Sequence, residues 1–374
     1  MKTTTPGMWN RLLGQEAAVG VLRASLASDR VGHAYLFVGP RGVGRAPAAL
    51  ALAASVNCLD DGCGTCAICA KVLRRSHADV HHISAEGGQI VVDQVRALRE
   101  EASRAPFEGR MKVFIIDEAE RLNPAAGNAL LKVLEEPPSS ALFILMTDAP
   151  DDMLPTVVSR CRRIDFVPLG FTEIVEILTQ HHGVAEDRAA WAASAGGNLA
   201  AALRLSKDPA AEERRERHLS YPERLARAGL SSAISLAGEV RVEADEAVDR
   251  LKVRQKDEIK EHAEAYGEAR GTAAARKRLE VRHKREARRT EQQTYEIVLT
   301  DLAAWYRGAL LARHGDGAPD AQIEAALGDC ALSAPTTSFV DALERIEATR
   351  VALSRNAQAG LALEALFMHL GSIG

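Results

Sequence analysis

The sequence predicts an α/β module with a mostly parallel sheet, followed by a region built only from helices. Over about the first 170 residues, short apolar runs rich in β-branched residues alternate with stretches whose apolar residues recur every three or four positions. That alternation is typical of a parallel sheet covered by helices on both faces. No strand pattern follows Asp208, and aromatic residues are only 4% of the chain, so alanine and leucine supply most of the apolar 47%. This composition favours helices.

Each expected element follows from a local pattern. The expected strands are bounded apolar runs: Ala34–Val38, Val80–Ile83, Val113–Ile116, Leu142–Thr147 and Ile164–Val167. The helix-like patterns are Val92–Ala102, Pro124–Leu134, Phe171–His182 and Asp187–Ala195, the last ended by Gly196-Gly197. Tyr295–Ala312 and Phe339–Leu370 are amphipathic near the C-terminus.

A chain of 374 residues is long enough for two or three domains. We expect an α/β domain over residues 1–169, a small helical lid over 170–207 and a helical domain over 208–374. The apolar runs are far shorter than the ~18 residues that span a bilayer, and the N-terminus lacks the apolar core of a signal peptide. We therefore expect a cytoplasmic protein with no membrane partner.

A glycine-rich turn lies between the first expected strand and a helix, which is the context of a phosphate-binding P-loop. Gly39, Gly42 and Gly44 let backbone N–H groups curl around phosphate oxygens. A hydrolysing loop ends in Lys and then Ser or Thr, where this chain has Arg45 and Ala46. Arginine is a bulkier planar cation than lysine, and alanine lacks the hydroxyl that ligates Mg²⁺. We expect a P-loop that does not hydrolyse nucleotide, while binding of ATP or ADP stays open.

The expected strand Val113–Ile116 ends in Asp117 and Glu118, as in a Walker B motif. In an active site the aspartate would hold Mg²⁺, and the glutamate would polarise the attacking water. At this distance after a P-loop, the pair supports a nucleotide-binding fold and completes the degenerate nucleotide site.

Three further motifs resemble those of the AAA+ subunits of bacterial DNA polymerase III clamp loaders. Asn128–Pro138, reading NALLKVLEEPP, looks like the helix and turn that follow Walker B in those subunits. Ser159-Arg160-Cys161 matches their SRC motif, and Leu13-Gly14-Gln15 resembles the segment over their adenine pocket. The likeness covers residues 8–205, and the remainder is similar to the family's collar domain only in being helical.

The resemblance implies a subunit type as well as a fold. In this family the gamma/tau subunits are ATPase motors, delta opens the clamp and delta-prime is a rigid stator. Arg45 and Ala46 depart from the motors and agree with delta-prime, and Ala200 stands where motors carry a sensor-2 arginine. The likeness implies a stator in a hetero-pentamer with gamma/tau and delta, which loads the sliding clamp onto primed DNA. Such a subunit belongs to a DNA-directed DNA polymerase holoenzyme without intrinsic activity of its own.

Arg160 keeps its family role in this interpretation. Because the SRC motif lies on the face opposite the subunit's own P-loop in the family, the resemblance implies that Arg160 acts in trans. As an arginine finger it would enter the ATP site of a neighbouring gamma/tau subunit. The rival interpretation is an autonomous AAA+ motor, for which the retained Asp117 and Glu118 speak.

Four of the six cysteines lie together, at Cys58, Cys63, Cys66 and Cys69. Four soft thiolates are the set that tetrahedral Zn²⁺ prefers, and a site with no open position is structural. The grouping favours metal binding in a reducing compartment over a disulfide framework.

One ligand of this zinc module stays open, because the family spaces its first two cysteines more widely than Cys58 and Cys63. The alternative ligands are His77, His81 and His82, which are otherwise expected to be surface or strand-edge histidines. Of the lone cysteines, Cys161 is expected to be a small buried residue beside Arg160 and Cys330 a core residue.

The stretch 239–293 is dense in charge and is expected to be a helical extension, with i,i+4 pairs such as Glu246 and Arg250. It contains a basic run: Arg276, Lys277, Arg278, Arg282, Lys284, Arg285, Arg288 and Arg289. Such a run is usually a solvated helix face, and binding of DNA or an acidic partner is the alternative. The net charge of −4 and the pI near 6.3 speak against a zinc-ribbon DNA-binding protein, so DNA contact should be local and weak.

Overall fold

The structure, a computed structural model, describes residues 7–28, 30–85, 88–193, 198–228, 230–266, 272–315, 321–328, 334–354 and 357–372. The chain separates into two compact units, Met1–Lys207 and Asp208–Gly374.

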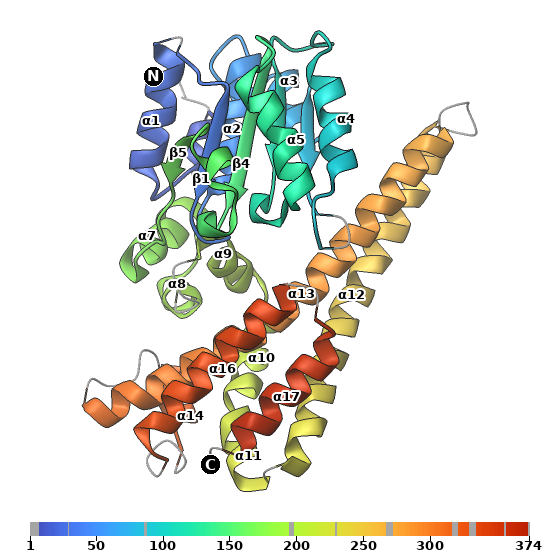
Figure 1. Cartoon of the computed structure of the whole chain (residues 1–374). Coiled ribbons are helices and arrows are strands. Elements are labelled where there is room, and N and C mark those ends of the chain that lie inside the picture. Colours follow the sequence, from blue (N-terminus) through green and yellow to red (C-terminus); the bar gives the residue numbers. More distant parts are fainter. Residues whose placement is uncertain are drawn as a thin grey trace. The chain divides into compact units, whose positions relative to one another are not determined.

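A five-stranded parallel sheet forms the centre of the first unit, in the order β2-β3-β4-β1-β5 (Figure 1). The strands are β1 Ala34–Val38, β2 Val80–Ile83, β3 Lys112–Ile116, β4 Ala141–Thr147 and β5 Arg162–Asp165. Four of them agree with the sequence prediction to within one residue. The fifth lies two residues earlier, because β5 is an edge strand and pairs with β1 through polar residues, Arg162 opposite Tyr35 and Asp165 opposite Val38.

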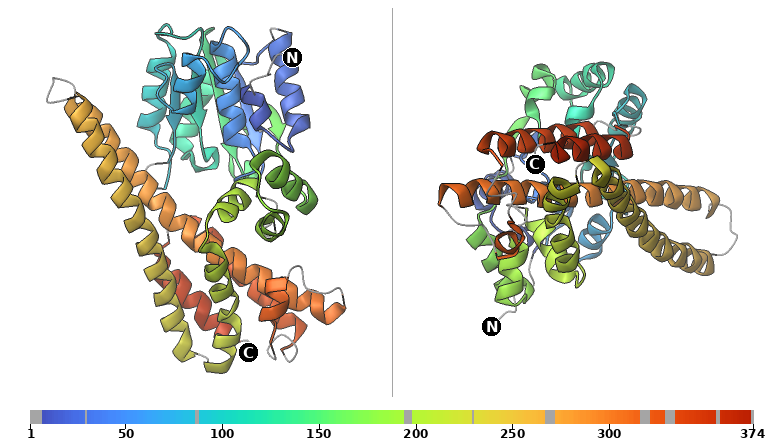
Figure 2. Two further views of the ribbon diagram at one scale, coloured as in Figure 1. Left: turned by 180° about the vertical axis from the view of Figure 1, so that it is seen from behind. Right: turned by 90° about the horizontal axis from the view of Figure 1, so that it is seen from below.

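Helices cover both faces of this sheet, as predicted (Figure 2). One face packs on α1 Glu16–Ala27, α2 Arg45–Asn57 and α3 Ala67–Leu73, and the other on α4 Val92–Ala102, α5 Pro124–Glu135 and α6 Pro155–Val158. Short 3-10 turns cover Met8–Arg11, Ala119–Arg121 and Pro150–Asp152. Successive side chains of β1 point to opposite faces of the sheet. Tyr35 and Phe37 therefore lie in the hydrophobic core under α2, and Leu36 lies in the core under α5.

Three short helices with a core of their own follow the sheet. They are α7 Phe171–His182, α8 Glu186–Ala193 and α9 Leu199–Lys207, and Ile174, Leu178 and Ala192 are buried among them. Helix α7 has the predicted bounds and α8 begins one residue early. Gly196 and Gly197, which were expected to end it, lie outside the described residues. The parallel sheet with helices on both faces, followed by a small helical bundle, confirms the predicted order of elements in the first unit.

The second unit is helical throughout the part of it that the structure describes. Its helices are α10 Ala211–Leu219, α11 Tyr221–Ala228, α12 Leu230–Tyr266, α13 Thr272–His314, α14 Ala321–Ala326, α16 Thr336–Ser354 and α17 Ala359–Gly371. Tyr221, Trp305, Phe339 and Phe367 are fully buried at its centre. The long helices α12 and α13 run side by side (Figures 1 and 2).

Polar contacts join the charged parts of α12 and α13. The Gln255 side chain is buried and donates to the carbonyl of His283 at 3.3 Å and to Glu286 Oε2 at 2.9 Å. The expected Glu246–Arg250 ion pair is present at 3.7 Å. In the basic run, Lys284, Arg288 and Arg289 are exposed, while the side chains of Arg276, Lys277, Arg278, Arg282 and Arg285 lie outside the described residues.

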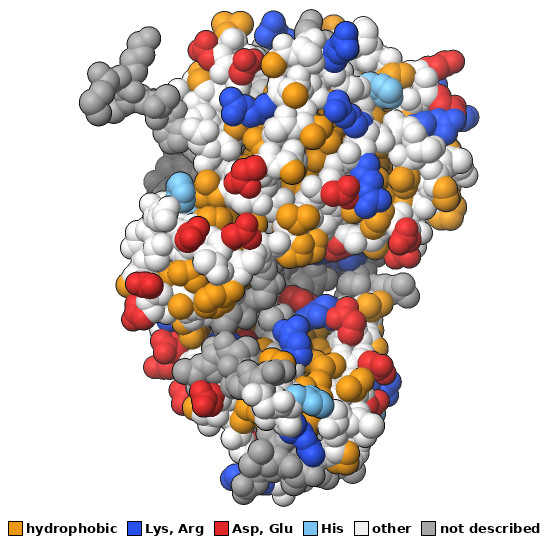
Figure 3. Space-filling view, turned by 90° about the vertical axis from the view of Figure 1, so that its left-hand side faces the viewer, with side chains coloured by type: hydrophobic (Ala, Val, Ile, Leu, Met, Phe, Trp, Pro, Cys, Tyr) orange, Lys and Arg blue, Asp and Glu red, His pale blue; other side chains and the backbone are white. Residues whose placement is uncertain are grey.

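Basic and acidic side chains are interspersed on the face of the molecule shown in Figure 3. This agrees with the small net charge of −4. Among the described helices, none is long and apolar enough to cross a membrane.

Candidate functional site

The P-loop has the backbone that its glycines predict. Gly39, Gly42 and Gly44 have φ angles of +150°, +82° and +122°, and α2 begins directly after them. A Cβ atom on Gly39 would lie 2.2 Å from the carbonyl oxygen of Phe166, so no other residue fits there. The loop therefore keeps the shape of a phosphate-binding turn.

The two substituted positions open the first turn of α2. The Arg45 side chain is almost wholly buried, and burial, aided by Arg41, lowers its pKa against the opposing effect of Asp148 and Asp117. Ala46 packs against the apolar core on the α2 side of the sheet. The loop therefore presents a cation at position 45 but no hydroxyl at position 46 to hold Mg²⁺.

A second P-loop cation, Arg41, pairs with acids at the ends of two strands. Its Nη2 contacts Oε1 of Glu118, which follows β3, and its Nε lies 3.3 Å from Oδ2 of Asp148, which follows β4. Arg121 Nε holds the other oxygen of Glu118 at 3.1 Å. Burial by itself lowers the pKa of Arg41, but the two carboxylates outweigh it and raise the pKa. The Walker B glutamate is thus engaged by arginines of its own chain.

Residues at the start of α9, the last helix of the small bundle, touch the P-loop backbone. Asn198 Nδ2 donates to the carbonyl of Arg41 at 2.9 Å, and the N–H of Ala200 faces the carbonyl of Gly42 at 3.4 Å. A Cβ atom on Gly42 would lie 2.0 Å from Asn198 Oδ1. At the position expected for a sensor-2 arginine, Ala200 offers the loop a backbone N–H and no cation.

The segment expected over an adenine pocket is tied to the end of the sheet. The buried Gln15 side chain donates to the carbonyl of Val167 at 2.7 Å and accepts from its N–H at 3.1 Å. Leu12 and Gln15 also lie against Gly44. This segment therefore links the P-loop to the connection between β5 and α7.

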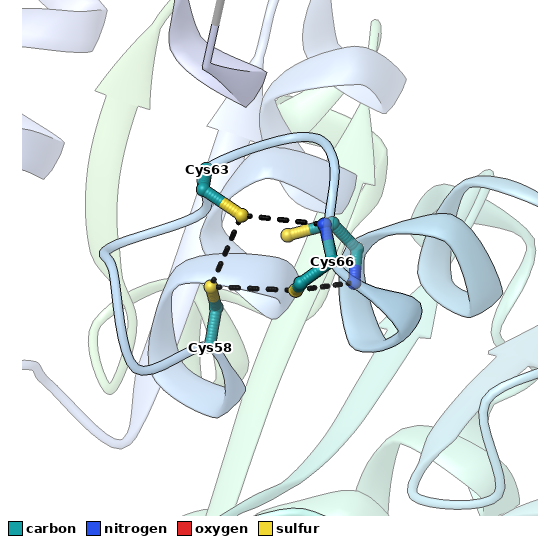
Figure 4. Close-up of side chains that lie close together, drawn as sticks. Cys58, Cys63 and Cys66 are labelled. Carbon is teal, nitrogen blue, oxygen red and sulfur yellow. Dashed lines mark hydrogen bonds between the residues drawn. The ribbon is translucent and has the colours of Figure 1, made fainter. Parts of the chain in front are cut away.

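Cys58, Cys63 and Cys66 point their sulfurs toward one another (Figure 4), and Cys69 completes the group. The Sγ atom of Cys58 lies 3.8 Å from that of Cys63 and 3.7 Å from that of Cys66, and all four sulfurs, including Cys69, are within 4.8 Å of one another. Four sulfurs bound tetrahedrally about 2.3 Å from one Zn²⁺ would lie about 3.8 Å apart, whereas a disulfide needs about 2.05 Å. The spacing fits a shared metal ion.

Backbone N–H groups surround these sulfurs. The N–H groups of Asp60, Cys66 and Cys69 donate at 3.4 Å to the sulfurs of Cys58, Cys63 and Cys66 respectively. Hydrogen bonds from the Thr65 side chain and backbone lower the pKa of Cys63 to about 6, whereas burial raises the pKa of Cys69. Donors aimed at sulfur stabilise thiolates, the form that binds metal.

None of the three candidate histidines joins this cluster, which among the described residues is the one group that could hold a metal ion. His81 and His82 lie in the edge strand β2, where His81 stacks on Phe114 with ring centroids 4.9 Å apart. His77 is buried, and its Nδ1 accepts the N–H of Asp79 at 3.1 Å. Cys58, and not a histidine, therefore completes the group of four.

Arg160 lies just after α6 and keeps part of its surface open. Its Nη2 lies 2.6 Å from Oε1 of Glu135, the last residue of α5, and its Nη1 donates to the carbonyl of Thr156 at 3.1 Å. The Arg160 side chain is 37% exposed. Cys161 beside it is half-buried, and burial raises its pKa to about 12. Cys330 lies outside the described residues.

Comparison with known proteins places these motifs in a family. Residues 14–170 match the family described as DNA polymerase III, delta subunit. This match covers less than half of the chain. Its sequence is 37% identical to the delta' subunit of Bacillus subtilis DNA polymerase III over 204 residues, 54% of this chain and 62% of that protein.

The chain is also similar to proteins named as tau and gamma-related subunits of DNA polymerase III. It is 41% identical over 165 residues to the tau subunit of Bacillus subtilis DNA polymerase III, 43% of this chain and 29% of that protein. A gamma subunit-related protein from Thermotoga maritima superposes with a TM-score of 0.41 and 14% identity, covering 94% of this chain and 99% of that one. The chain spans less than two thirds of the delta' and tau relatives, and its similarity to both does not decide between these subunit types.

Sequence reasoning missed several partners of the site. The sequence held a signal for Arg41, because the phosphate loop contains a second arginine besides Arg45 and acids follow two of the expected strands. In the structure Arg41 pairs with those acids, Glu118 after β3 and Asp148 after β4. Asn198 and Glu135 gave no local signal. Their contacts with Arg41 and Arg160 join residues 157 and 25 positions apart and exist only in the folded chain.

Proposed function

We propose that this chain is the delta-prime stator subunit of a cytoplasmic DNA polymerase III clamp loader. It would assemble with gamma/tau and delta in a hetero-pentamer and support the loading of the sliding clamp onto primed DNA. It would meet the clamp mostly through the complex and DNA weakly. In this role the chain has no enzymatic activity of its own, although it belongs to a DNA polymerase holoenzyme.

One combination carries the proposal: a P-loop without a Mg²⁺-binding hydroxyl in the same unit as a partly exposed SRC arginine. Arg45 and Ala46 remove the groups that position γ-phosphate and Mg²⁺, and Arg41 draws Glu118 into an internal ion pair. ATP or ADP could still bind at Gly39, Gly42, Gly44, Arg45 and Asp117, but turnover is not expected.

Arg160 would act in the ATP site of a neighbouring gamma/tau subunit. A guanidinium placed at the γ-phosphate stabilises the charge that develops in phosphoryl transfer, and such arginine fingers contribute about 10³–10⁵-fold in rate. The exposed side chain and its single carboxylate partner support this role, because an arginine with free N–H groups can bind phosphate.

The cysteine cluster would hold a structural Zn²⁺. Cys58, Cys63, Cys66 and Cys69 supply four thiolates at the spacing that tetrahedral coordination needs. The ion would neutralise these thiolates and fix the loop between α2 and α3, and it would leave no position for substrate.

The direct test is a clamp loader reconstituted with gamma/tau and delta, carrying Arg160→Ala. We expect assembly to be intact, and ATP hydrolysis stimulated by clamp and DNA to fall by about 10³-fold at the site beside this subunit. Unchanged ATP hydrolysis and clamp loading would contradict the proposal.

A gamma/tau-like motor is the second candidate, supported by the 41% identity to a tau subunit and by the retained Asp117 and Glu118. ATP hydrolysis by the isolated protein separates the two. A motor would turn over ATP in a manner that Glu118→Gln abolishes, whereas the stator would show no hydrolysis above background.

A further inference from the structure

The guanidinium of Arg160 is held by two anchors on two different nitrogens. The Glu135 carboxylate binds Nη2 at 2.6 Å and the Thr156 carbonyl accepts from Nη1 at 3.1 Å. Two anchors fix the plane of a rigid group, where one would leave it free to rotate. Since arginine has five N–H donors, three remain for another ligand.

The position of Glu135 is not explained by the stability of its helix. It is the last residue of α5, where a carboxylate lies against the negative end of the helix dipole. The side chains of Glu135 and Arg160 are 48% and 37% exposed, and exposed ion pairs add little to folding stability. An acid at this place therefore adds little to the stability of the fold, while its carboxylate lies 2.6 Å from Arg160 Nη2.

The backbone on both sides of the pair is well fixed. Helix α5 (Figure 1) packs against the sheet through Leu130 and Leu134 and also contacts α6. Helix α6 begins at Pro155, and the N–H of Arg160 closes the following turn on the carbonyl of Val157 at 3.2 Å. Both anchors of the guanidinium therefore belong to packed elements and not to a loose loop.

We propose that Glu135 is a positioning residue that pre-orients Arg160 for the γ-phosphate of ATP bound to the neighbouring subunit. The inference rests on the function proposed above. Glu135 does not touch the nucleotide. It holds one edge of the guanidinium, so that the three remaining N–H groups meet the phosphate without a search through rotamers.

The test uses the complete reconstituted complex and compares Glu135→Gln with Glu136→Gln. Glu136 is the next residue, is exposed and loses the same charge in its variant. Because a small misplacement of a catalytic group lowers the rate strongly, we expect Glu135→Gln to lower kcat for ATP about 10-fold. The KM for ATP and the thermal stability of the subunit should not change, and Glu136→Gln should match the wild type.

The double variant Glu135→Gln/Arg160→Ala shows whether Glu135 acts through Arg160. We expect its kcat to equal that of Arg160→Ala alone. A wild-type or raised kcat in Glu135→Gln, or a further fall in the double variant, would overturn the positioning role while leaving the finger intact. Wild-type kcat in Arg160→Ala would remove the proposed function itself and the positioning role with it.

Discussion

Arg160 in the first unit and His218 in the second are basic residues that differ in their exposure and in the number of their carboxylate partners. Arg160 is 37% exposed and has one carboxylate partner. The His218 side chain is 0% exposed and lies between two carboxylates, with Nδ1 2.8 Å from Asp301 Oδ2 and Nε2 3.1 Å from Glu243 Oε2.

This difference in exposure and in the number of partners distinguishes a charge that stabilises the fold, that of His218, from one that is available to a partner, that of Arg160. Both ring nitrogens of His218 face acceptors, so the ring needs both protons and has no donor left. It joins α10 to Glu243 of α12 and to Asp301 of α13. Arg160 keeps three N–H groups that a ligand could use, and the proposed function assigns them to the ATP of a neighbouring subunit.

In the cysteine cluster, a bound metal ion would neutralise the charge of the thiolates. Loss of that metal should have the largest effect on stability of all the changes considered. Structural zinc sites contribute about 10–16 kcal/mol of apparent binding free energy. We expect one equivalent of zinc per purified chain by elemental analysis, and a large fall in the unfolding temperature on chelation. Cys58→Ser should lose the metal, and Cys161→Ser, outside the cluster, should keep it. Full retention of zinc in Cys58→Ser would exclude Cys58 as a ligand.

Removal of the buried histidine, His218, should have the second-largest effect on stability. Breaking a buried hydrogen-bonded ion pair costs about 3–5 kcal/mol, so His218→Ala should lower the free energy of unfolding of the second unit by about that amount. The matched control is His369→Ala, because His369 is partly exposed and faces one carboxylate, Asp341, at 2.6 Å. That variant should lose at most about 1 kcal/mol. Chemical denaturation measures both losses of unfolding free energy. Equal losses in His218→Ala and His369→Ala would contradict the distinction between a buried, fully paired charge and a partly exposed one.

The same histidine predicts a pH dependence. Burial by itself lowers the pKa of His218, but hydrogen bonds to Asp301 and Glu243 outweigh it and raise the pKa above its usual value. A raised pKa in the folded state contributes stability below the unfolded pKa of about 6.5. That contribution is lost as pH rises through the folded value. The stability advantage of wild type over His218→Ala should therefore shrink as the pH rises above neutrality, and a growing advantage would show the opposite sign.

A substitution of Gly42 in the P-loop should cause the smallest loss of stability in this series. Gly42 and Gly183 both have positive φ angles, +82° and +65°. An added Cβ on Gly183 meets nothing within 4 Å, whereas on Gly42 it would lie 2.0 Å from Asn198 Oδ1. Left-handed strain alone costs about 1 kcal/mol, so Gly183→Ala should lose that much, and Gly42→Ala about 1–2 kcal/mol more. If thermal unfolding gives equal losses, Asn198 does not pack on the P-loop.

The sheet was predictable because its strands are short apolar runs with clear limits. Only β5 was displaced, since its pairing residues Arg162 and Asp165 are polar and the apolar pattern could not mark them. The P-loop glycines and the four cysteines were found because spacing alone defines them. The pairing of Arg41 with Glu118, of Asn198 with the Arg41 carbonyl and of His218 with Asp301 depends on tertiary packing across long stretches of sequence, which local patterns do not contain.

We propose that Arg160 acts on a partner subunit, whereas His218 stabilises only the fold of its own unit. The most direct measurement compares Arg160→Ala and His218→Ala for both thermal unfolding and ATP hydrolysis per assembled clamp loader. We expect opposite results for the two variants: Arg160→Ala keeps its unfolding temperature and loses about 10³-fold in ATP hydrolysis beside this subunit. His218→Ala unfolds at a lower temperature and keeps its rate below that temperature. Full ATP hydrolysis in complexes that carry Arg160→Ala would contradict the account.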